Sequence, residues 1–151
     1  MRAEVKSTDT KKVVVGDNTF YITPFPAFTA VNVFGYLTKD LLPAVGGIAG
    51  LLQKIQNGFD SDINDVVPML QEIVANIDGD VMESTARRLL TQYKNVVFDD
   101  EDGRAKTLCE DDVNEIFCQD IIGIAKLAYE VINVNYADFF SGLRVLLGGA
   151  K

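Results

Sequence analysis

The sequence contains no histidine and no tryptophan in its 151 residues. Without histidine, the chain lacks the side chain that most often acts as a general base near neutral pH, and the imidazole that ligates most metal centres. The serines are therefore left without a histidine partner, and none of them lies in a nucleophile-elbow motif. We expect a protein without enzymatic activity and without a cofactor.

Basic residues are also scarce. The chain has 14 lysines and arginines against 22 aspartates and glutamates, which gives a formal net charge of −8. A protein that binds nucleic acid mainly by neutralising phosphates needs the opposite excess. Nucleic acid is therefore not an expected partner.

Only two cysteines occur, Cys109 and Cys118. If both lie on one helix, nine residues turn the second about 180° from the first, so they do not form a disulfide. A structural zinc site needs about four cysteine or histidine ligands, so no metal is expected. Unpaired cysteines with apolar neighbours are typical of a reducing compartment, where they pack as small hydrophobic residues. We therefore expect a cytoplasmic protein.

No apolar run is long enough to cross a membrane. The uncharged stretch Leu41–Leu52 falls short of the ~20 residues that a spanning helix needs. The segment Met1–Lys12 is charged and polar, and Val13–Val15 is too short for the core of a signal peptide. Gly46–Gly50 lacks the Gly-Lys-Ser/Thr ending of a phosphate-binding loop. We expect no membrane partner, and a buried role for Leu41–Leu52.

The periodicity predicts a mainly α (α+β) fold of about five to six helices in a single domain, residues 1–151. Two β-rich runs flank Gly16–Thr19 and predict an N-terminal hairpin, and residues 95–108 predict a second short hairpin. Apolar stripes at three- and four-residue spacing predict the helices. They are expected over Pro26–Leu42, from Asn64 or Asp65 to Ile77, from Asp80 to near Lys94, from Glu110 to near Asn133, and from Asn135 to near Leu147.

Two features predict details of these helices. Asp80 and Glu83 have the spacing of a capping box, and Glu83 and Arg87 that of an i,i+4 ion pair. The aromatic cluster Tyr136–Phe140 is expected to close the core.

Two acidic segments invite a comparison with cation sites. Asp60–Asn64 matches the first ligand positions of a calcium loop, but Asp65 replaces the glycine of the turn and Gln71 the bidentate glutamate. We interpret it as the entry to a helix. The run Asp99, Asp100, Glu101 and Asp102 is expected to form a solvated hairpin tip that contacts a partner; a divalent-metal-dependent enzyme using this turn is the alternative.

Apolar residues are in excess for so acidic a chain, at 48% of the sequence with nine phenylalanines. Such a surplus fills a large core or is covered by another protein. Phe25 and Phe28 flank Pro26 and either anchor a protein contact or pack the hairpin onto the first helix. With Val31 and Phe34 on that helix, they are the candidate contact residues, and self-association is a further possibility.

The order of these parts resembles the tail assembly chaperones of long-tailed bacteriophages and prophages. The portions that carry the resemblance are YITPFPAFTAVNVFGYL after the first hairpin, the turn with DDEDG, and VINVNYADFF near the end. The resemblance implies a non-enzymatic protein that binds tape-measure and tail-tube proteins in the host cytoplasm and is absent from the mature virion. It also implies a longer form of the chain made by ribosomal frameshifting. The alternative is a structural tail or connector subunit that is retained in the virion.

Overall fold

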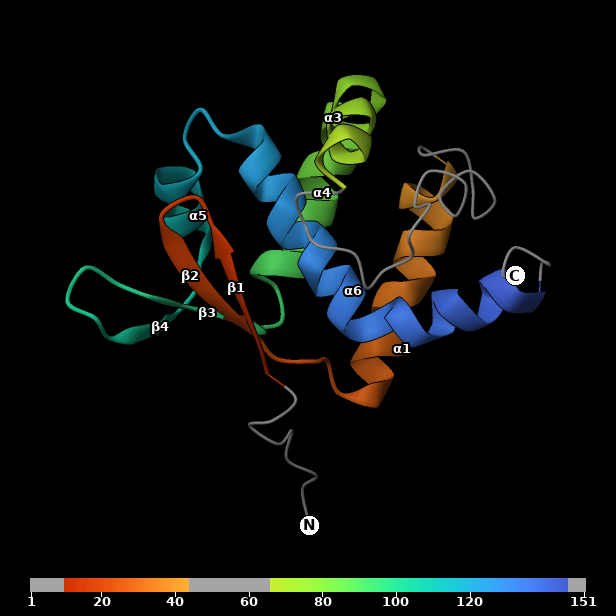
Figure 1. Ribbon diagram of the computed structural model, residues 1–151, viewed down its shortest axis with the longest axis horizontal. Coiled ribbons are helices and arrows are strands. Elements are labelled where there is room, and N and C mark those ends of the chain that lie inside the picture. The colour runs from red at the N-terminus through yellow and green to blue at the C-terminus, as the bar shows by residue number, and fades with distance from the viewer. Residues whose placement is uncertain (1–9, 44–65, 147–151) are drawn as a thin grey trace, which may run out of the picture.

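The computed structural model describes residues 10–43 and 66–146, and the side chains of the last helix as far as Phe139. Four strands form one sheet, and helices pack against it (Figure 1). The elements are β1 (Lys11–Val15), β2 (Asn18–Ile22), α1 (Ala27–Tyr36), the π-helical turn η2 (Leu37–Leu41), α3 (Val67–Asn76), α4 (Gly79–Leu90), β3 (Val96–Asp99), β4 (Ala105–Thr107), α5 (Glu110–Ile116) and α6 (Ile121–Leu146). The predicted α+β class, with five α-helices and the π-helical turn among these residues, is confirmed.

Both predicted hairpins are present, and they join into one antiparallel sheet in the order β1-β2-β3-β4. The first turns at Gly16, whose φ of +61° suits glycine, and the second at Gly103, with φ of +77°. The junction between the hairpins pairs Phe20 with Phe98 and Ile22 with Val96. This junction was not predicted, because no local pattern indicates pairing between strands so far apart in the chain.

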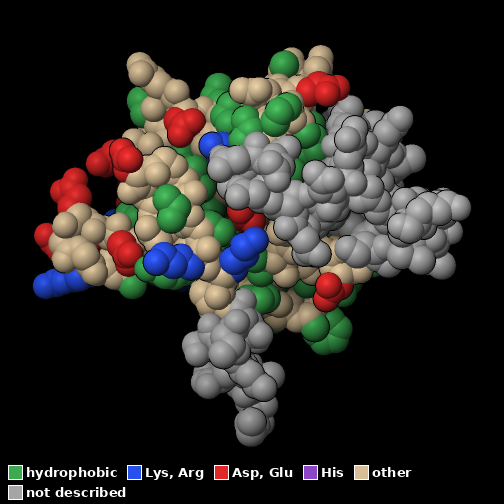
Figure 2. Space-filling model, viewed as in Figure 1, with side chains coloured by type: hydrophobic (Ala, Val, Ile, Leu, Met, Phe, Trp, Pro, Cys, Tyr) green, Lys and Arg blue, Asp and Glu red, His purple; other side chains and the backbone are tan. Residues whose placement is uncertain are grey.

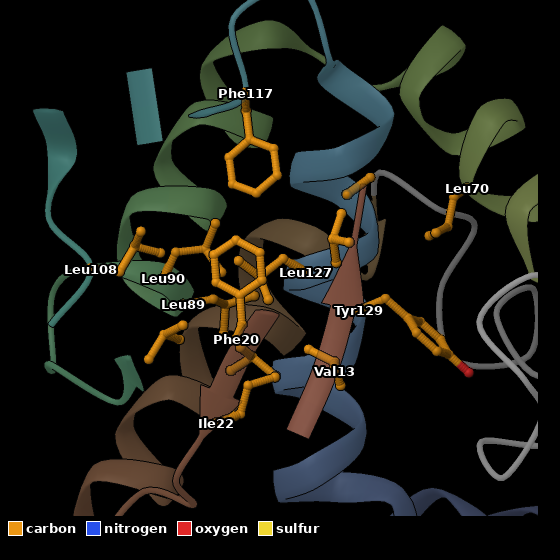
Figure 3. Close-up of a cluster of buried hydrophobic side chains, with 14 of the residues drawn as sticks. Val13, Phe20, Ile22, Leu70, Leu89, Leu90, Leu108, Phe117, Leu127 and Tyr129 are labelled. Atoms are coloured by element: carbon orange, nitrogen blue, oxygen red, sulfur yellow. The ribbon is translucent and has the colours of Figure 1, made fainter. Parts of the chain in front are cut away.

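The core lies between the sheet and the helices (Figure 3). Phe20 is fully buried at its centre, with its ring 5.8 Å from that of Phe117 and 6.3 Å from that of Phe98. Leu89 and Leu90 of α4 lie beside it in Figure 3. At about 25 cal/mol per Å² of apolar surface, such a fully buried ring contributes roughly 2–3 kcal/mol.

Helix α6 packs against α3, α4 and the first two strands, and its middle is buried as the sequence predicts. Leu127 and Val131 are completely inaccessible to solvent. Glu130 on the same stretch is also buried and pairs with Lys11 of β1 at 2.8 Å. The long helix thus ties the N-terminal strand to the helical part of the molecule.

The predicted helix boundary at Asn135 is wrong, and so is the continuous helix from Glu110 to Asn133. Helix α5 ends at Ile116, and Gln119 adopts a φ of +65° that reverses the chain. Asp120 immediately precedes α6, and its Oδ1 accepts a hydrogen bond from the Gly123 amide at 2.9 Å. Asn135 lies inside α6, where its Nδ2 donates to the Val131 carbonyl.

Two helix starts also differ from the prediction. Helix α3 is preceded by Val66, which makes no side-chain cap, rather than being capped by Asn64 or Asp65; Pro68 occupies its first turn. Asp78, not Asp80, caps α4, because its carboxylate accepts from the Asp80 amide.

Helix α4 is also shorter than predicted. It ends at Leu90 because Asn95 Nδ2 binds the Leu89 carbonyl at 3.0 Å and Lys94 has a φ of +55°. The predicted pair between Glu83 and Arg87 is present at 2.8 Å. The predicted first helix is present too, as α1 continued by η2.

The cysteines do not share a helix, and the expectation that they pack as small hydrophobic residues is wrong. Cys109 precedes α5 and Cys118 follows it, and both are free and exposed. Cys109 donates from its backbone amide and its Sγ to Asp112 Oδ2. Burial raises the pKa of the Asp112 carboxyl, but these bonds and the one from Lys106 outweigh it and hold that pKa below its ordinary value.

Some expectations fall on residues that the structure does not describe. Leu41–Leu52 lies outside the described residues from position 44 onward, and Gly46–Gly50 and Asp60–Asn64 lie outside them entirely. Across residues 10–43 and 66–146, no helix combines the length and the apolar character that crossing a membrane requires.

Candidate protein-interaction surface

Among the described residues, the two most exposed large apolar side chains lie on one helix. On α1, Phe28 is 91% exposed and Val31 is 69% exposed. A spacing of three residues places them on the same side of the helix. The ten residues of α1 include no charged side chain, so this side offers an apolar surface without a fixed charge.

Contacts on the opposite side of α1 determine which residues face solvent. Val33 is fully buried, and Tyr136 of α6 donates its hydroxyl to the Ala30 carbonyl at 2.8 Å. Immediately before α1, the Phe25 amide donates to Asn135 Oδ1 at 2.8 Å. Because α6 holds both the start and the middle of this segment, Phe28 and Val31 point away from the core.

The apolar surface continues from α1 onto α6. The Phe34 ring contacts that of Tyr136, with centroids 5.5 Å apart, and meets that of Phe139 edge to face at 4.9 Å. Phe139 is itself 49% exposed. We call Phe28, Val31, Phe34 and Phe139 the α1 face. Figure 2 shows hydrophobic side chains at the surface near the start of α1.

The two phenylalanines that flank Pro26 have opposite environments. Phe25 is 6% exposed and its ring meets that of Tyr93 edge to face at 5.5 Å. The packing alternative therefore describes Phe25, whereas Phe28 is left at the surface. Phe25 cannot contact a partner without leaving the core.

Phe139 is a surface residue that sequence reasoning missed, since the cluster Tyr136–Phe140 was expected to close the core. Tyr136 does so and is 5% exposed. Burial raises the pKa of its hydroxyl to about 12, with a smaller contribution from the charge of Tyr93. The spacing of three residues between Tyr136 and Phe139 could have indicated this position. In one continuous helix the two side chains lie on the same side, so Phe139 also contacts Phe34 of α1.

The acidic residues 99–102 lie at the tip of the second hairpin, where Figure 2 shows acidic side chains gathered. Asp100 stabilises the turn, with its Oδ1 accepting from the amides of Asp102 and Arg104 at 2.9 Å each. Asp99 accepts from the Tyr21 hydroxyl at 3.1 Å, and this bond is the main cause that raises the pKa of Tyr21. Glu101 and Asp102 are exposed.

No group of three or more metal-ligating side chains is assembled within the part of the chain that the structure describes. Apart from Phe139, the α1 face and the acidic tip remain the candidate contact surfaces that the sequence predicts. Covering a side chain such as Phe28 removes apolar area worth roughly 1.5–3 kcal/mol from water.

Comparison with known protein families gives a match over most of the chain. The family model described as phage tail assembly chaperone protein, TAC, matches residues 16–144. This span includes the candidate contact residues of α1 and the acidic tip. No curated protein and no solved structure matches the chain.

Proposed function

The chain belongs to the phage tail assembly chaperone family, and from that premise we propose that it binds the tape-measure protein or the tail-tube protein before they assemble. Membership implies protein partners that act in the host during tail assembly. The proposed role is to cover apolar surface of a client without catalysing a reaction. The protein works in the bacterial cytoplasm and leaves before the virion is complete.

The observation that carries the proposal is the exposed, uncharged α1 face. Phe28 is 91% exposed and Val31 is 69% exposed. Contact of these apolar side chains with water costs free energy, and covering them with a partner releases it. Aromatic side chains at the centre of an interface commonly supply much of its binding energy. The net charge of −8 keeps the free protein from aggregating through this surface.

Other features of the proposal concern copies of the same chain. The α1 face can be covered by a second copy until a client arrives, so a homo-oligomer is proposed as the resting state. A frameshifted longer form would carry the same face and could join such an oligomer.

Co-expression with the tape-measure and tail-tube proteins of the same phage tests the proposal. A tagged wild-type chain should capture at least one of them, and Phe28→Ser/Val31→Ser should weaken capture about tenfold or more. Val14→Ser is the matched control, since Val14 is an exposed valine on β1 at 58% exposure. Capture of neither protein, or equal capture by the double variant, would refute the proposal.

Mass spectrometry of purified virions tests the retained-subunit alternative. A chaperone is absent from mature particles, whereas a tail or connector subunit is present in fixed copy number.

Titration calorimetry with magnesium, manganese and calcium tests the metal-dependent alternative. Asp99 and Asp100 already accept hydrogen bonds within the sheet and the turn, which argues against their use as metal ligands. Stoichiometric binding of a cation at the tip would favour that alternative.

A further inference from the structure

A second surface, chemically different from the α1 face, lies where α4, α5 and the first turn of α6 meet (Figure 1). It is a groove of about 320 Å³ with an apolar floor. The floor is formed by Met82, Ala86, Val113, Ile121 and Ile124. Ile121 is 56% exposed at the groove, although its side chain is large and apolar.

The rim of the groove carries an ion-pair network centred on Arg87. Its Nη2 lies 2.8 Å from Glu83 Oε2, and its Nη1 contacts Glu110 Oε1. The hydrogen bond to Glu110, and then that to Glu83, raise the pKa of the guanidinium above its ordinary value. The network joins α4 to α5 across the groove while the three side chains stay about half exposed.

Carboxylates outnumber cations around this groove. Arg87 is the one cationic residue among those that line it, against Glu83 and Glu110. Asp78 and Asp80 flank Gly79 at one end, and Asp111 follows Glu110 at the other. A ligand that complements this surface must combine apolar side chains with positive charge.

Three residues of the floor also line a second cavity on their other side. Met82, Ala86 and Ile124 line a further apolar space of about 110 Å³ between α3, α4 and α6. The groove, at which Ile121 is half exposed, is the space that can receive apolar side chains of a ligand. An amphipathic helix presents such side chains at i and i+3 or i+4.

We propose that this groove binds a basic amphipathic helix of a partner protein, whose apolar side chains cover Ile121 and whose lysines or arginines pair with Glu83 and Glu110. A second copy of this chain is a poor occupant because its net charge of −8 repels the same rim. The inference rests on the proposed function only in taking the partner to be a client of the chaperone.

The test uses the full chain and a labelled 14-residue peptide whose leucines and lysines are spaced to form the two faces of an amphipathic helix. Fluorescence anisotropy measures the binding. The same peptide with glutamate in place of lysine should not bind. Glu83→Gln/Glu110→Gln should weaken binding of the basic peptide by roughly fivefold or more, and Ile121→Ser by a similar factor.

The control removes the same charge elsewhere. Glu101→Gln/Asp102→Asn lies at the hairpin tip, and we expect it to leave the affinity within about twofold after screening at physiological salt. Equal weakening by both double variants would show general charge attraction and overturn the proposal. So would an absence of binding, or unchanged binding by the groove variants; circular dichroism confirms that each variant is folded.

The two proposals fail separately. Phe28→Ser/Val31→Ser should leave peptide binding unchanged, because these residues do not line the groove. Loss of client capture by that variant with intact peptide binding supports both surfaces. Peptide binding that disappears in the α1 face variant would overturn the assignment of the peptide to the groove.

Discussion

Lys11 Nζ lies 2.8 Å from Glu130 Oε1, which joins the first strand to the middle of the last helix. The Glu130 side chain is 8% exposed, whereas that of Lys11 is 41% exposed. The carboxylate therefore depends on its partner more than the ammonium does.

Removing only the lysine should destabilise the protein. Lys11→Met leaves the Glu130 carboxylate buried without its ion-pair partner, and we expect the free energy of unfolding to fall by about 1–3 kcal/mol. Lys11→Met/Glu130→Met should recover most of that loss, because replacing both partners by apolar groups is close to neutral. Urea unfolding followed by circular dichroism measures both; a single variant as stable as wild type would contradict the prediction.

Phe25 and Phe28 allow a matched comparison of one residue type in two environments. Phe25→Ala should lower the free energy of unfolding by about 3–4 kcal/mol, since the ring is 6% exposed and packs on Tyr93. Phe28→Ala should change it by no more than ~0.5 kcal/mol. Thermal melts of the two variants provide the measurement, and similar melting temperatures would show that the two environments are not distinct.

Gly123 and Gly35 provide a second matched pair, both within helices. A Cβ at Gly123 would overlap the Asp120 carboxylate and lie 2.9 Å from Phe117 Cδ1, so Gly123→Ala should cost about 1–3 kcal/mol. Around Gly35 a Cβ would have no neighbour within 4 Å, so Gly35→Ala should stabilise the protein by about 0.5–1 kcal/mol. Denaturation midpoints of opposite sign relative to wild type are the expected result; equal shifts would refute it.

Tyr136 predicts a loss of stability in alkaline solution. Burial raises the pKa of its hydroxyl to about 12 in the folded protein, against 10.0 for the ordinary group. The folded state therefore holds this proton more tightly than the unfolded chain does. The resulting stabilisation is complete below about pH 10 and is lost as the pH rises toward 12.

Comparison with Tyr136→Phe isolates this group from the other residues that titrate in the same range. The variant should be less stable than wild type at pH 8, because it lacks the hydrogen bond to the Ala30 carbonyl. The difference should shrink between pH 10 and 12, as only wild type has this proton to lose. Parallel stability curves over that range would contradict the assignment.

Local signals in the sequence were sufficient for much of the fold. Gly16 between two β-rich runs predicted the first hairpin, and the acidic segment ending at Gly103 predicted the second. The apolar spacing of α1, α3 and α4 predicted these helices within a few residues at most ends. Each of these signals depends on residues that are close together in the sequence, and such local patterns can be recognised in a single sequence.

The break between α5 and α6 could not be predicted in this way. Residues 117–120 contain neither glycine nor proline, and the positive φ falls on Gln119. This conformation is costly for a residue with a side chain, and packing of the buried Phe117 ring on Phe20 accompanies it. The break therefore depends on a tertiary contact, and the contacting residue, Phe20, lies 97 positions before Phe117 in the sequence.

The candidate surface was predicted in part. Periodicity placed Phe28, Val31 and Phe34 on one helix, but it could not determine which side of α1 faces solvent. That choice depends on Asn135 and Tyr136 of α6, which hold the backbone of Phe25 and Ala30. The groove beside Arg87 needs three helices in position, so no single segment contains its signal.

Pairing of β2 with β3 has a consequence for how the protein is made. The partner strand of Ile22 begins at Val96, so a nascent chain must extend by more than seventy residues before the sheet can be completed. At a translation rate of about 5–20 residues per second, the apolar face of the first hairpin stays uncovered for roughly 4–15 s. A two-stranded hairpin is marginal on its own, so fragments that stop before residue 96 should remain unfolded and be degraded.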